Sequence, residues 1–251
     1  MSRGGGRSLA LRRRIAFWLA LFCLAALWPL PAVRGEEASV RRERALLIGV
    51  DEFVSQPSAY PSSTNNVYAM QEMFQSAAEP LEKILVPDAP VTSVQQLTEL
   101  IQRVFGGAEA GDVSYLYLST HGLYDPENGV EPALLLSDGQ TENRLTPEEL
   151  EAAFDGISGT KVLILDACNS GAFIGKGMTE WDEPPCFLGD DFKVITSSGA
   201  REESWYWSAG EEEKQVDRQG AFYFTQALCD ALSAACGYPA DQNHDGSITL
   251  K

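Results

Sequence analysis

Short apolar runs separated by helical patterns are the feature that most constrains what this chain can fold into. Residues 45–50 (ALLIGV) and 162–165 (VLIL) are unbroken apolar runs, and residues 113–119 (VSYLYLS) form a third, largely apolar one. Runs of this length are typical of strands that are buried on both faces, as in a parallel sheet. Residues 84–86 and 192–196 fit two further strands.

Helical patterns fill the intervals between these runs. Apolar residues recur at helical spacing over 65–77 and 221–235, and Thr92 or Ser93 can cap a helix that runs through Phe105. The alternation predicts an α/β fold in which a mainly parallel sheet carries helices on both faces, a three-layer sandwich. With 251 residues, of which 44% are apolar, the chain can bury a sizeable core, and a single domain is expected.

Four other segments carry local signals. Residues 131–136 indicate the arm of a hairpin, and Thr146-Pro-Glu-Glu indicates a helix start with Thr146 as the cap. Residues 169–191 and 199–219 lack periodicity and are long enough to be functional loops.

The N-terminal 35 residues predict an export signal. They hold six Arg and no acidic residue, and residues 15–33 are uncharged. Cleavage is expected just before Glu36, which places the protein outside the cell or at its surface. An uncleaved membrane anchor is the alternative, because 19 uncharged residues can span a thin bilayer. The expected organisation is a signal peptide or anchor over 1–35, a linker over 36–44 and a folded domain over 45–251.

Charge separates this N-terminal segment from the rest of the chain. Residues 36–251 hold 13 basic and 36 acidic residues, and so a net charge of −23. Such an acidic body repels phosphate backbones, which excludes nucleic acid as an expected partner. It would attract cationic ligands such as Lys- or Arg-rich peptides, although solubility alone also accounts for the excess.

Four cysteines follow the predicted signal: Cys168, Cys186, Cys229 and Cys236. Cys229 and Cys236 lie seven residues apart in a helical pattern, about 10.5 Å along a helix axis, whereas bridged Cα atoms lie within roughly 7 Å. They are therefore expected to be unpaired and to pack as small hydrophobic residues. A free Cys168 in an exported protein requires a functional reason.

His121 and Cys168 both follow expected buried strands. Ligands of a parallel sheet bind beyond the carboxyl ends of its strands, where loops converge. If the two strands are neighbours, the imidazole and the thiol meet there, and an imidazole can activate a thiol for attack on an amide carbonyl. Taken singly, Cys168 also fits a buried core thiol, and His121 a structural turn residue.

The segments ALLIGV, YLYLSTHG and LILDACNSGAF resemble the caspase-like cysteine peptidases, nearest to metacaspases and bacterial caspase-domain proteins. The resemblance covers roughly Arg44 to Lys251 and implies a caspase-like sheet. It implies that His121 is the general base and acid and that Cys168 is the nucleophile of an acyl-enzyme mechanism. It also implies an oxyanion hole formed by the backbone N–H groups of Gly122 and Cys168, and glycine at this position allows the backbone to approach the oxyanion.

Asp166 carries the specificity prediction. Caspases have Gln-Ala-Cys where this chain has Asp-Ala-Cys, which counts against cleavage after Asp. The resemblance to metacaspases implies that Asp166 lines the S1 pocket and pairs with Arg or Lys; the alternative is a strand-end residue that accepts local backbone hydrogen bonds. A second acidic pocket residue of metacaspases aligns with Asn65-Asn66, where this chain has amides. Asp51 either supplies the acidic charge that is missing at positions 65 and 66 or is a solvated turn residue.

The segment after the fifth strand supplies weaker candidates. Ser197 matches the substrate-binding edge of the family and is a candidate pocket residue. Residues 205–207 (WYW) fit either an apolar subsite wall or a cover for the edge of the sheet.

Asp241, Asn243 and Asp245 fit the first half of an EF-hand calcium loop. The carboxylate of the twelfth position would be residue 252, and relatives continue into a final helix, so a truncation at Lys251 is expected. The alternatives are weak calcium binding and a plain acidic turn. The chemistry requires no cofactor, and the resemblance allows calcium as an activator.

Two functions remain open after these inferences. The first is an exported cysteine endopeptidase that cleaves protein or peptide substrates after Arg or Lys. The second is a catalytically weak or inactive caspase-like module that acts in binding or signalling. A membrane is expected as a partner only through an uncleaved N-terminal segment.

Overall fold

The predicted parallel sheet is present and has five strands. The computed structural model describes residues 41–56, 62–178, 186–208, 220–233 and 236–243, all within one compact unit that spans 40–251. The strands lie in the order β2-β1-β3-β7-β8, and every neighbouring pair is parallel. Their bounds are β1 Glu43–Gly49, β2 Lys83–Leu85, β3 Val113–Ser119, β7 Thr160–Asp166 and β8 Phe192–Thr196.

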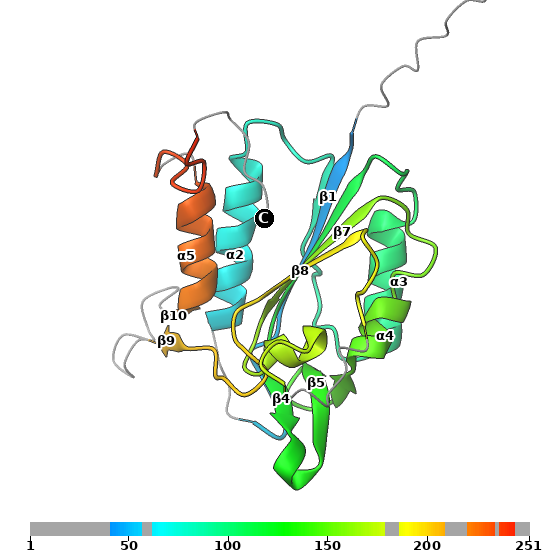
Figure 1. Ribbon diagram of the computed structural model, residues 1–251, viewed down its shortest axis with the longest axis vertical. Coiled ribbons are helices and arrows are strands. Elements are labelled where there is room, and N and C mark those ends of the chain that lie inside the picture. The colour runs from blue at the N-terminus through cyan, green and yellow to red at the C-terminus, as the bar shows by residue number, and fades with distance from the viewer. Residues whose placement is uncertain (1–40, 57–61, 179–185, 209–219, 234–235, 244–251) are drawn as a thin grey trace, which may run out of the picture. The chain divides into compact units, whose positions relative to one another are not determined.

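Helices cover both faces of this sheet, which confirms the three-layer prediction. Figure 1 shows α2 and α5 side by side on one face, with α3 and α4 on the other. Their bounds are α2 Ser62–Gln75, α3 Val94–Phe105, α4 Pro147–Ala152 and α5 Tyr223–Leu232.

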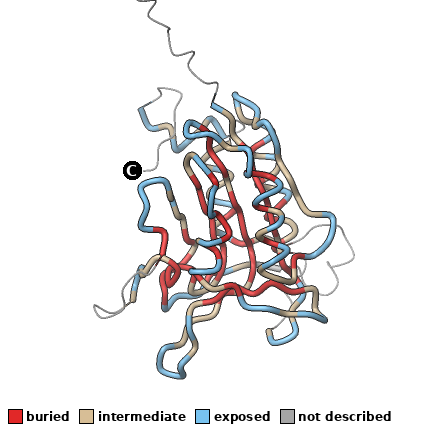
Figure 2. Tube along the Cα trace, turned by 90° about the vertical axis from the view of Figure 1, so that its right-hand side faces the viewer, coloured by how far each residue is buried: buried red, intermediate tan, exposed pale blue. Residues whose placement is uncertain are grey.

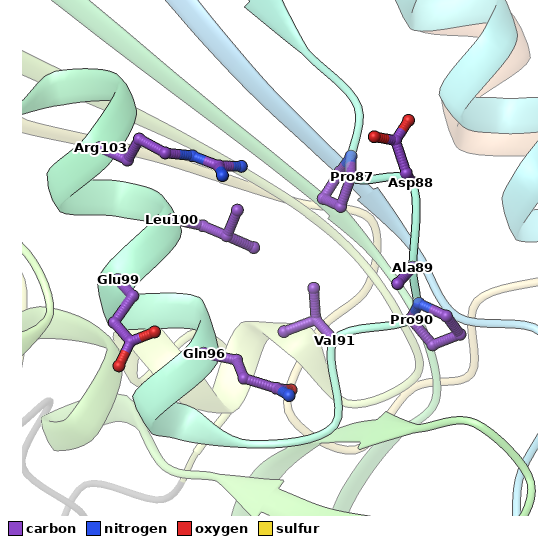
Figure 3. Close-up of a pocket in the computed structure, with 9 residues that line it drawn as sticks. All are labelled: Pro87, Asp88, Ala89, Pro90, Val91, Gln96, Glu99, Leu100 and Arg103. Atoms are coloured by element: carbon purple, nitrogen blue, oxygen red, sulfur yellow. The ribbon is translucent and has the colours of Figure 1, made fainter.

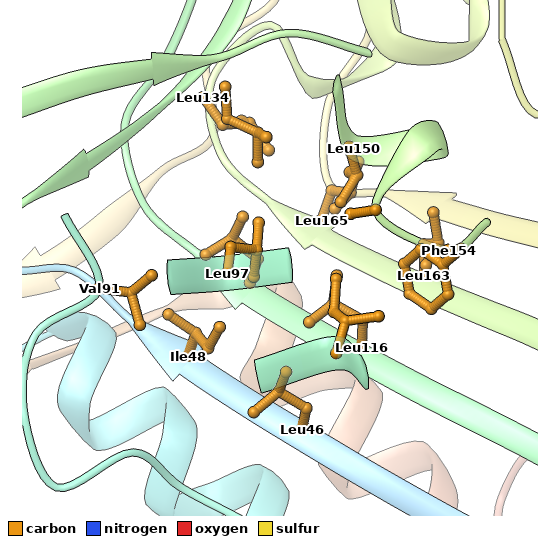
Figure 4. Packing of buried hydrophobic residues seen from close by; sticks show 14 of the residues in the cluster. Leu46, Ile48, Val91, Leu97, Leu116, Leu134, Leu150, Phe154, Leu163 and Leu165 are labelled. Atoms are coloured by element: carbon orange, nitrogen blue, oxygen red, sulfur yellow. The ribbon is translucent and has the colours of Figure 1, made fainter. Parts of the chain in front are cut away.

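The alternation of side chains along β1 divides the interior into two cores. Leu46 and Ile48 pack in the larger core with α3 and α4, whereas Ala45 and Leu47 pack in the smaller core with α2 and α5. Figure 4 shows the larger core around Leu116, and Figure 2 shows buried residues concentrated along the central strands. Each fully buried Leu contributes about 1.5–3 kcal/mol of transfer free energy to folding.

Helix starts follow the local signals in the sequence. Ser93 caps α3, because its hydroxyl accepts a hydrogen bond from the Gln96 N–H group. Thr92 instead bonds to the side chain of Gln96. Thr146 forms a capping box with Glu149 at the start of α4.

A small antiparallel sheet lies beside the carboxyl ends of the central strands. It consists of β4 Gly122–Asp125, β5 Val130–Ser137 and β6 Glu142–Leu145, in that order. The sequence predicted only one arm, over 131–136. The other two strands have four residues each, too short for a periodic pattern to show.

Several boundaries differ from the prediction. The helix expected over 221–235 begins at Tyr223 and ends at Leu232, because β10 Gly220–Phe222 pairs with β9 Tyr206–Ser208. The two expected loops contain β9 and the short 3₁₀ helix η2 Ser170–Ile174, and a second one, η1 Pro126–Asn128, follows β4. β1 starts at Glu43, so the last two residues of the expected linker belong to the sheet.

All four described cysteines are free. Cys229 is half-buried, with its sulfur 3.6 Å from that of Met70, as expected for a small hydrophobic residue. Cys236 is exposed, so the prediction that it packs in the same way is wrong. It lies after the end of α5, where the apolar face of the helix no longer continues.

The predicted signal or anchor, residues 1–35, lies outside the described residues. In the part of the chain that the structure describes, no helix combines the length and the apolar character needed to cross a membrane.

Candidate active site

His121 and Cys168 lie at matching positions beyond two neighbouring strands. β3 and β7 pair in parallel, and their last paired residues are Ser119 and Asp166. His121 and Cys168 each follow two residues later, and the Thr120 N–H group donates to the Asp166 carbonyl at 3.2 Å. The two side chains therefore leave the sheet at the same edge, as the sequence predicted.

Gly122 brings the two turns into contact. A Cβ atom at this position would lie 1.8 Å from the carbonyl oxygen of Cys168 and 3.3 Å from the Cβ atom of Ala167. Only glycine leaves room for so close an approach of the two backbones. The turn that follows His121 thus packs directly on the turn that holds Cys168.

His121 is half-buried and held from two sides. Its carbonyl accepts a hydrogen bond of 2.9 Å from the N–H group of Leu135 on β5. Its ring lies against that of Phe53, with the ring centroids 4.4 Å apart and the planes tilted by 56°.

Cys168 lies on a sharp turn between β7 and η2. The next residue, Asn169, has a left-handed backbone conformation with a φ of 56°, which Asn tolerates better than most residues. The Asn169 side chain donates to the Ala200 carbonyl at 2.8 Å, and its backbone N–H donates to the Glu202 carbonyl at 2.8 Å. These contacts tie the turn to the segment that follows β8.

Ser197 supports the same turn. Its hydroxyl accepts a hydrogen bond from the Ala167 N–H group at 3.0 Å and donates to the Ala167 carbonyl at 3.2 Å. Ser197 thus fixes the backbone between Asp166 and Cys168.

The thiol of Cys168 contacts the backbone of Ser204. The Ser204 N–H group donates to the sulfur at 3.2 Å, and the thiol donates to the Ser204 carbonyl at 3.6 Å. Burial raises the pKa of Cys168; the Ser204 N–H group opposes the shift and the charge of Glu203 adds to it. The thiol is therefore protonated at neutral pH and needs a base before it can act as a nucleophile.

Asp166 is fully buried beneath this thiol turn. Its carboxylate accepts hydrogen bonds from the Ser204 hydroxyl at 2.9 Å and the Thr225 hydroxyl at 2.7 Å, and the Asn66 amide lies 3.5 Å away. Burial raises the pKa of Asp166, and the hydroxyl groups partly oppose the shift. The side chain of Ser197 also bonds to this carboxylate, and the side chains that converge on it are all neutral.

The amides at positions 65 and 66 connect α2 to β10. Asn65 donates to the Gly220 carbonyl at 2.7 Å, and the Asn66 side-chain oxygen accepts the Phe222 N–H group at 3.1 Å. Asn66 therefore belongs to the surroundings of Asp166, although the charge expected there by family resemblance is missing.

Asp51 stabilises the start of α2. It is buried, and its carboxylate accepts the N–H groups of Ser63 at 2.8 Å and Thr64 at 3.0 Å. The alternative that Asp51 is a solvated turn residue is therefore wrong. Burial raises its pKa, against the opposing effect of the hydrogen bonds from Thr64 and Ser63.

Only two of the three calcium candidates fall within the described residues. Asp241 and Asn243 belong to the short described segment 236–243, and Asp245 lies outside the described residues. Within the described ranges, no three His, Cys, Asp or Glu side chains are grouped so that they could hold a metal ion.

A pocket of about 420 Å³ lies between residues 87–91 and α3. Figure 3 shows its lining side chains, which include Arg103 and Glu99 on the helix and Val91 on the loop. None of its nine lining residues is a predicted site residue.

Three residues near the site were not anticipated from the sequence: Phe53, Ser204 and Thr225. Thr225 lies within a helical pattern and Ser204 within a segment without periodicity, so neither carried a signal of its own. The only sequence signal that could have identified Phe53 is its position: it is an aromatic residue shortly after a buried strand, at the edge where ligands bind.

The fold and the site together define an α/β protein with an imidazole and a thiol at one edge of a parallel sheet. A caspase domain matches residues 42–245, from just before β1 to beyond α5. Because this match covers most of the sequence, the chain belongs to the caspase-domain family of cysteine peptidases.

Solved structures provide more distant comparisons. Caspase-1 from Spodoptera frugiperda is 16% identical, with a TM-score of 0.49 over 77% of this chain and 71% of that chain. Protein GSU0716 from Geobacter sulfurreducens is 19% identical, with a TM-score of 0.40 over 52% of this chain. The alignment spans 51%, or about half, of the Geobacter protein. No curated protein matches the sequence.

Proposed function

We propose that the protein is a cysteine endopeptidase that cleaves after Arg or Lys and uses His121 and Cys168 as its catalytic pair. The observation that carries the proposal is the register of β3 and β7, which places both residues two positions beyond the paired strand ends. The direct contact between the Gly122 and Cys168 backbones adds to it.

The reaction begins with transfer of the Cys168 thiol proton to His121. The thiolate attacks the scissile carbonyl, and the backbone N–H groups of Gly122 and Cys168 stabilise the negative charge on the carbonyl oxygen. The imidazolium gives its proton to the departing amine, which leaves an acyl-enzyme. His121 then takes a proton from water, the hydroxide attacks the thioester, and the thiol is restored as the acid product leaves.

Asp166 supports the preference for a basic P1 residue. It is a buried carboxylate whose four identified side-chain partners are neutral, so a guanidinium or ammonium group would supply the counter-charge that the site lacks. The Ser204 backbone contacts the partly exposed thiol, and the Ser204 hydroxyl donates to the buried carboxylate. A basic P1 side chain must therefore displace this hydroxyl before it can pair with Asp166.

The contacts of Ser204 also favour a second candidate function, a catalytically weak or inactive module that acts in binding or signalling. If the Ser204 hydroxyl stays in place, the fully buried Asp166 is not accessible to a basic P1 side chain. The amides at Asn65 and Asn66, where metacaspases carry an acidic pocket residue, point the same way.

A panel of fluorogenic peptides with Arg, Lys, Asp or Asn at P1 tests the proposal. It uses the wild type, Cys168→Ala and His121→Ala under reducing conditions, with and without calcium. We expect turnover after Arg and Lys, and a loss of at least about 1,000-fold in both variants, as for other paired nucleophiles and bases. Turnover after Asp would reject the specificity, and no turnover under any condition would favour the binding module.

A further inference from the structure

The loop that follows β1, residues 51–56, lies against the imidazole of His121. Phe53 is half-buried, and its ring centroid is 4.4 Å from that of His121. The other side of Phe53 packs on the larger core. The neighbouring Val54 is 58% exposed, so the loop directs one apolar side chain towards the site and the other towards solvent.

Glu142 on β6 fixes this loop. Its carboxylate accepts the N–H groups of Val54 at 2.8 Å and Ser55 at 3.3 Å, together with the hydroxyl of Ser55. Partial burial raises the pKa of Glu142, but the hydrogen bonds from Ser55 and Val54, together with the charge of Arg144, outweigh it and lower the pKa overall. Glu142 is therefore ionised at neutral pH, and its hydrogen bonds to the loop are charge-assisted.

The same hairpin also holds the backbone of His121. Leu135 on β5 donates its N–H group to the His121 carbonyl at 2.9 Å. β5 and β6 are paired, with Ser137 opposite Glu142. The small sheet thus fixes both the main chain of His121 and the loop that places Phe53 on its ring.

We propose that Phe53 is a positioning residue for His121 and that Glu142 holds Phe53 in place. This inference rests on the proposed role of His121 as the catalytic base. An imidazole at the end of a strand can turn about two side-chain bonds, and a packed aromatic ring restricts both. A general base must stay within hydrogen-bonding reach of its proton, and a displacement of 1 Å can cost about 100-fold in rate.

The test replaces Phe53 with a smaller apolar residue and with other rings. Phe53→Leu is expected to lower kcat about 10- to 100-fold with KM within about two-fold, because the nucleophile loses its aligned base while the substrate pocket is intact. Phe53→Tyr and Phe53→Trp should restore most of kcat. Val54→Ala is the matched control; it alters the exposed neighbour, keeps both backbone bonds to Glu142, and should leave kcat unchanged.

Glu142→Gln tests the position of Phe53 without changing the Phe53 side chain. It should lower kcat by less than Phe53→Leu, and the double variant should be no slower than Phe53→Leu alone, because both changes act through the same contact. If the fold losses in kcat of the two single variants multiply in the double variant, Glu142 does not act through Phe53 and its proposed role is wrong. Thermal unfolding of each variant identifies any that fails to fold.

Alkylation of Cys168 by iodoacetamide separates this inference from the proposed function. If the wild type cleaves no peptide, the proposed function fails; slower alkylation in both His121→Ala and Phe53→Leu would still support the positioning role. If His121→Ala slows alkylation but Phe53→Leu and Glu142→Gln match the wild type, the positioning role is wrong.

Discussion

His121 and Cys168 occupy matching positions beyond β3 and β7, yet the segments around them are held in different ways. Backbone bonds to the small antiparallel sheet and the ring of Phe53 hold the His121 side. The Cys168 side depends on serine hydroxyls, a left-handed Asn169 and the contacts of Ser204. The main chain thus fixes the His121 side, whereas side-chain contacts and single backbone bonds hold the Cys168 side.

The difference has a physical origin. Antiparallel pairing satisfies backbone groups without side chains, so the His121 turn is fixed once the hairpin forms. Among the residues that the structure describes, no antiparallel strand pairs with the Cys168 turn, and single hydrogen bonds of about 1 kcal/mol each hold it. Contacts of that strength can be exchanged for contacts with a substrate.

Gly122→Ala is expected to have the largest effect, because the added methyl group forces the His121 turn and the Cys168 turn apart. The added Cβ atom would lie 1.8 Å from the Cys168 carbonyl oxygen, and neither backbone can yield without moving its turn. We expect a loss of about 3 kcal/mol or more in the free energy of unfolding, measured in urea, together with a loss of activity.

Gly107→Ala is the matched control, because no atom lies within 4 Å of a Cβ atom placed there. Its free energy of unfolding should stay within about 0.5 kcal/mol of the wild type. Wild-type stability and activity in Gly122→Ala would contradict the close approach of the two turns.

Asp166→Asn tests the Cys168 side alone. For substrates with Arg at P1, kcat/KM should fall about 10- to 100-fold, since a hydrogen bond to a charged group is worth about 1.5–3 kcal/mol. Neutral P1 residues should be affected far less. Asp230→Asn, an equal change of charge on the exposed face of α5, serves as the control. An equal loss for every P1 residue would assign Asp166 a structural role.

A smaller effect is expected from the titration of Asp166, whose raised pKa fixes how its contribution to the free energy of unfolding changes with pH. Burial raises the pKa of Asp166 in the folded protein above its value in the unfolded chain, about 3.9. The folded state then binds the proton more tightly, so the Asp166 contribution to stability falls as the pH rises from about 3.9 through the raised value and stays low above it. In urea unfolding from pH 3 to 7, the free energy of unfolding of the wild type minus that of Asp166→Asn should fall as the pH rises; a difference that does not change with pH would contradict the shift.

Ser204→Ala should have the smallest effect and the most specific one. It removes one hydroxyl bond to Asp166 and keeps the backbone contact with the thiol. The free energy of unfolding should fall by about 1 kcal/mol, while KM for Arg substrates decreases because the carboxylate has one competitor fewer. Ser76→Ala, which removes an exposed hydroxyl, is the control. A higher KM would mean that Ser204 assists binding.

The sequence predicted those parts of the site that local patterns determine. The runs 113–119 and 162–165 are apolar because both faces of their strands are buried, and this placed His121 and Cys168 at one edge. The roles expected for Gly122 and Asp166 came from the resemblance to metacaspases. The bounds of β3 and β8 agree with the prediction to the residue.

Long-range contacts account for what the sequence did not predict. Thr225 reaches Asp166 across 59 positions of the chain and Ser204 across 38, and no periodic pattern encodes such single contacts. Asp51 was considered for the substrate pocket or a solvated turn, but its carboxylate caps α2 from 12 residues upstream of Ser63. The four-residue strands β4 and β6 form only because β5 lies between them.

Site-resolved labelling of the four cysteines that the structure describes is the sharpest test of the pairing of His121 with Cys168. A peptidyl acyloxymethyl ketone with Arg at P1 is incubated with the protein, and the adduct is located by mass spectrometry. Burial raises the pKa values of Cys186 and Cys229 to about 12, so both should stay unlabelled. The exposed Cys236 reports the reactivity of an unassisted thiol.

We expect the main adduct on Cys168; it should form far faster than any adduct on Cys236, and its formation should slow at least about 100-fold in His121→Ala. Labelling of Cys236 at an equal or greater rate, or labelling of Cys168 that does not depend on His121, would contradict this expectation.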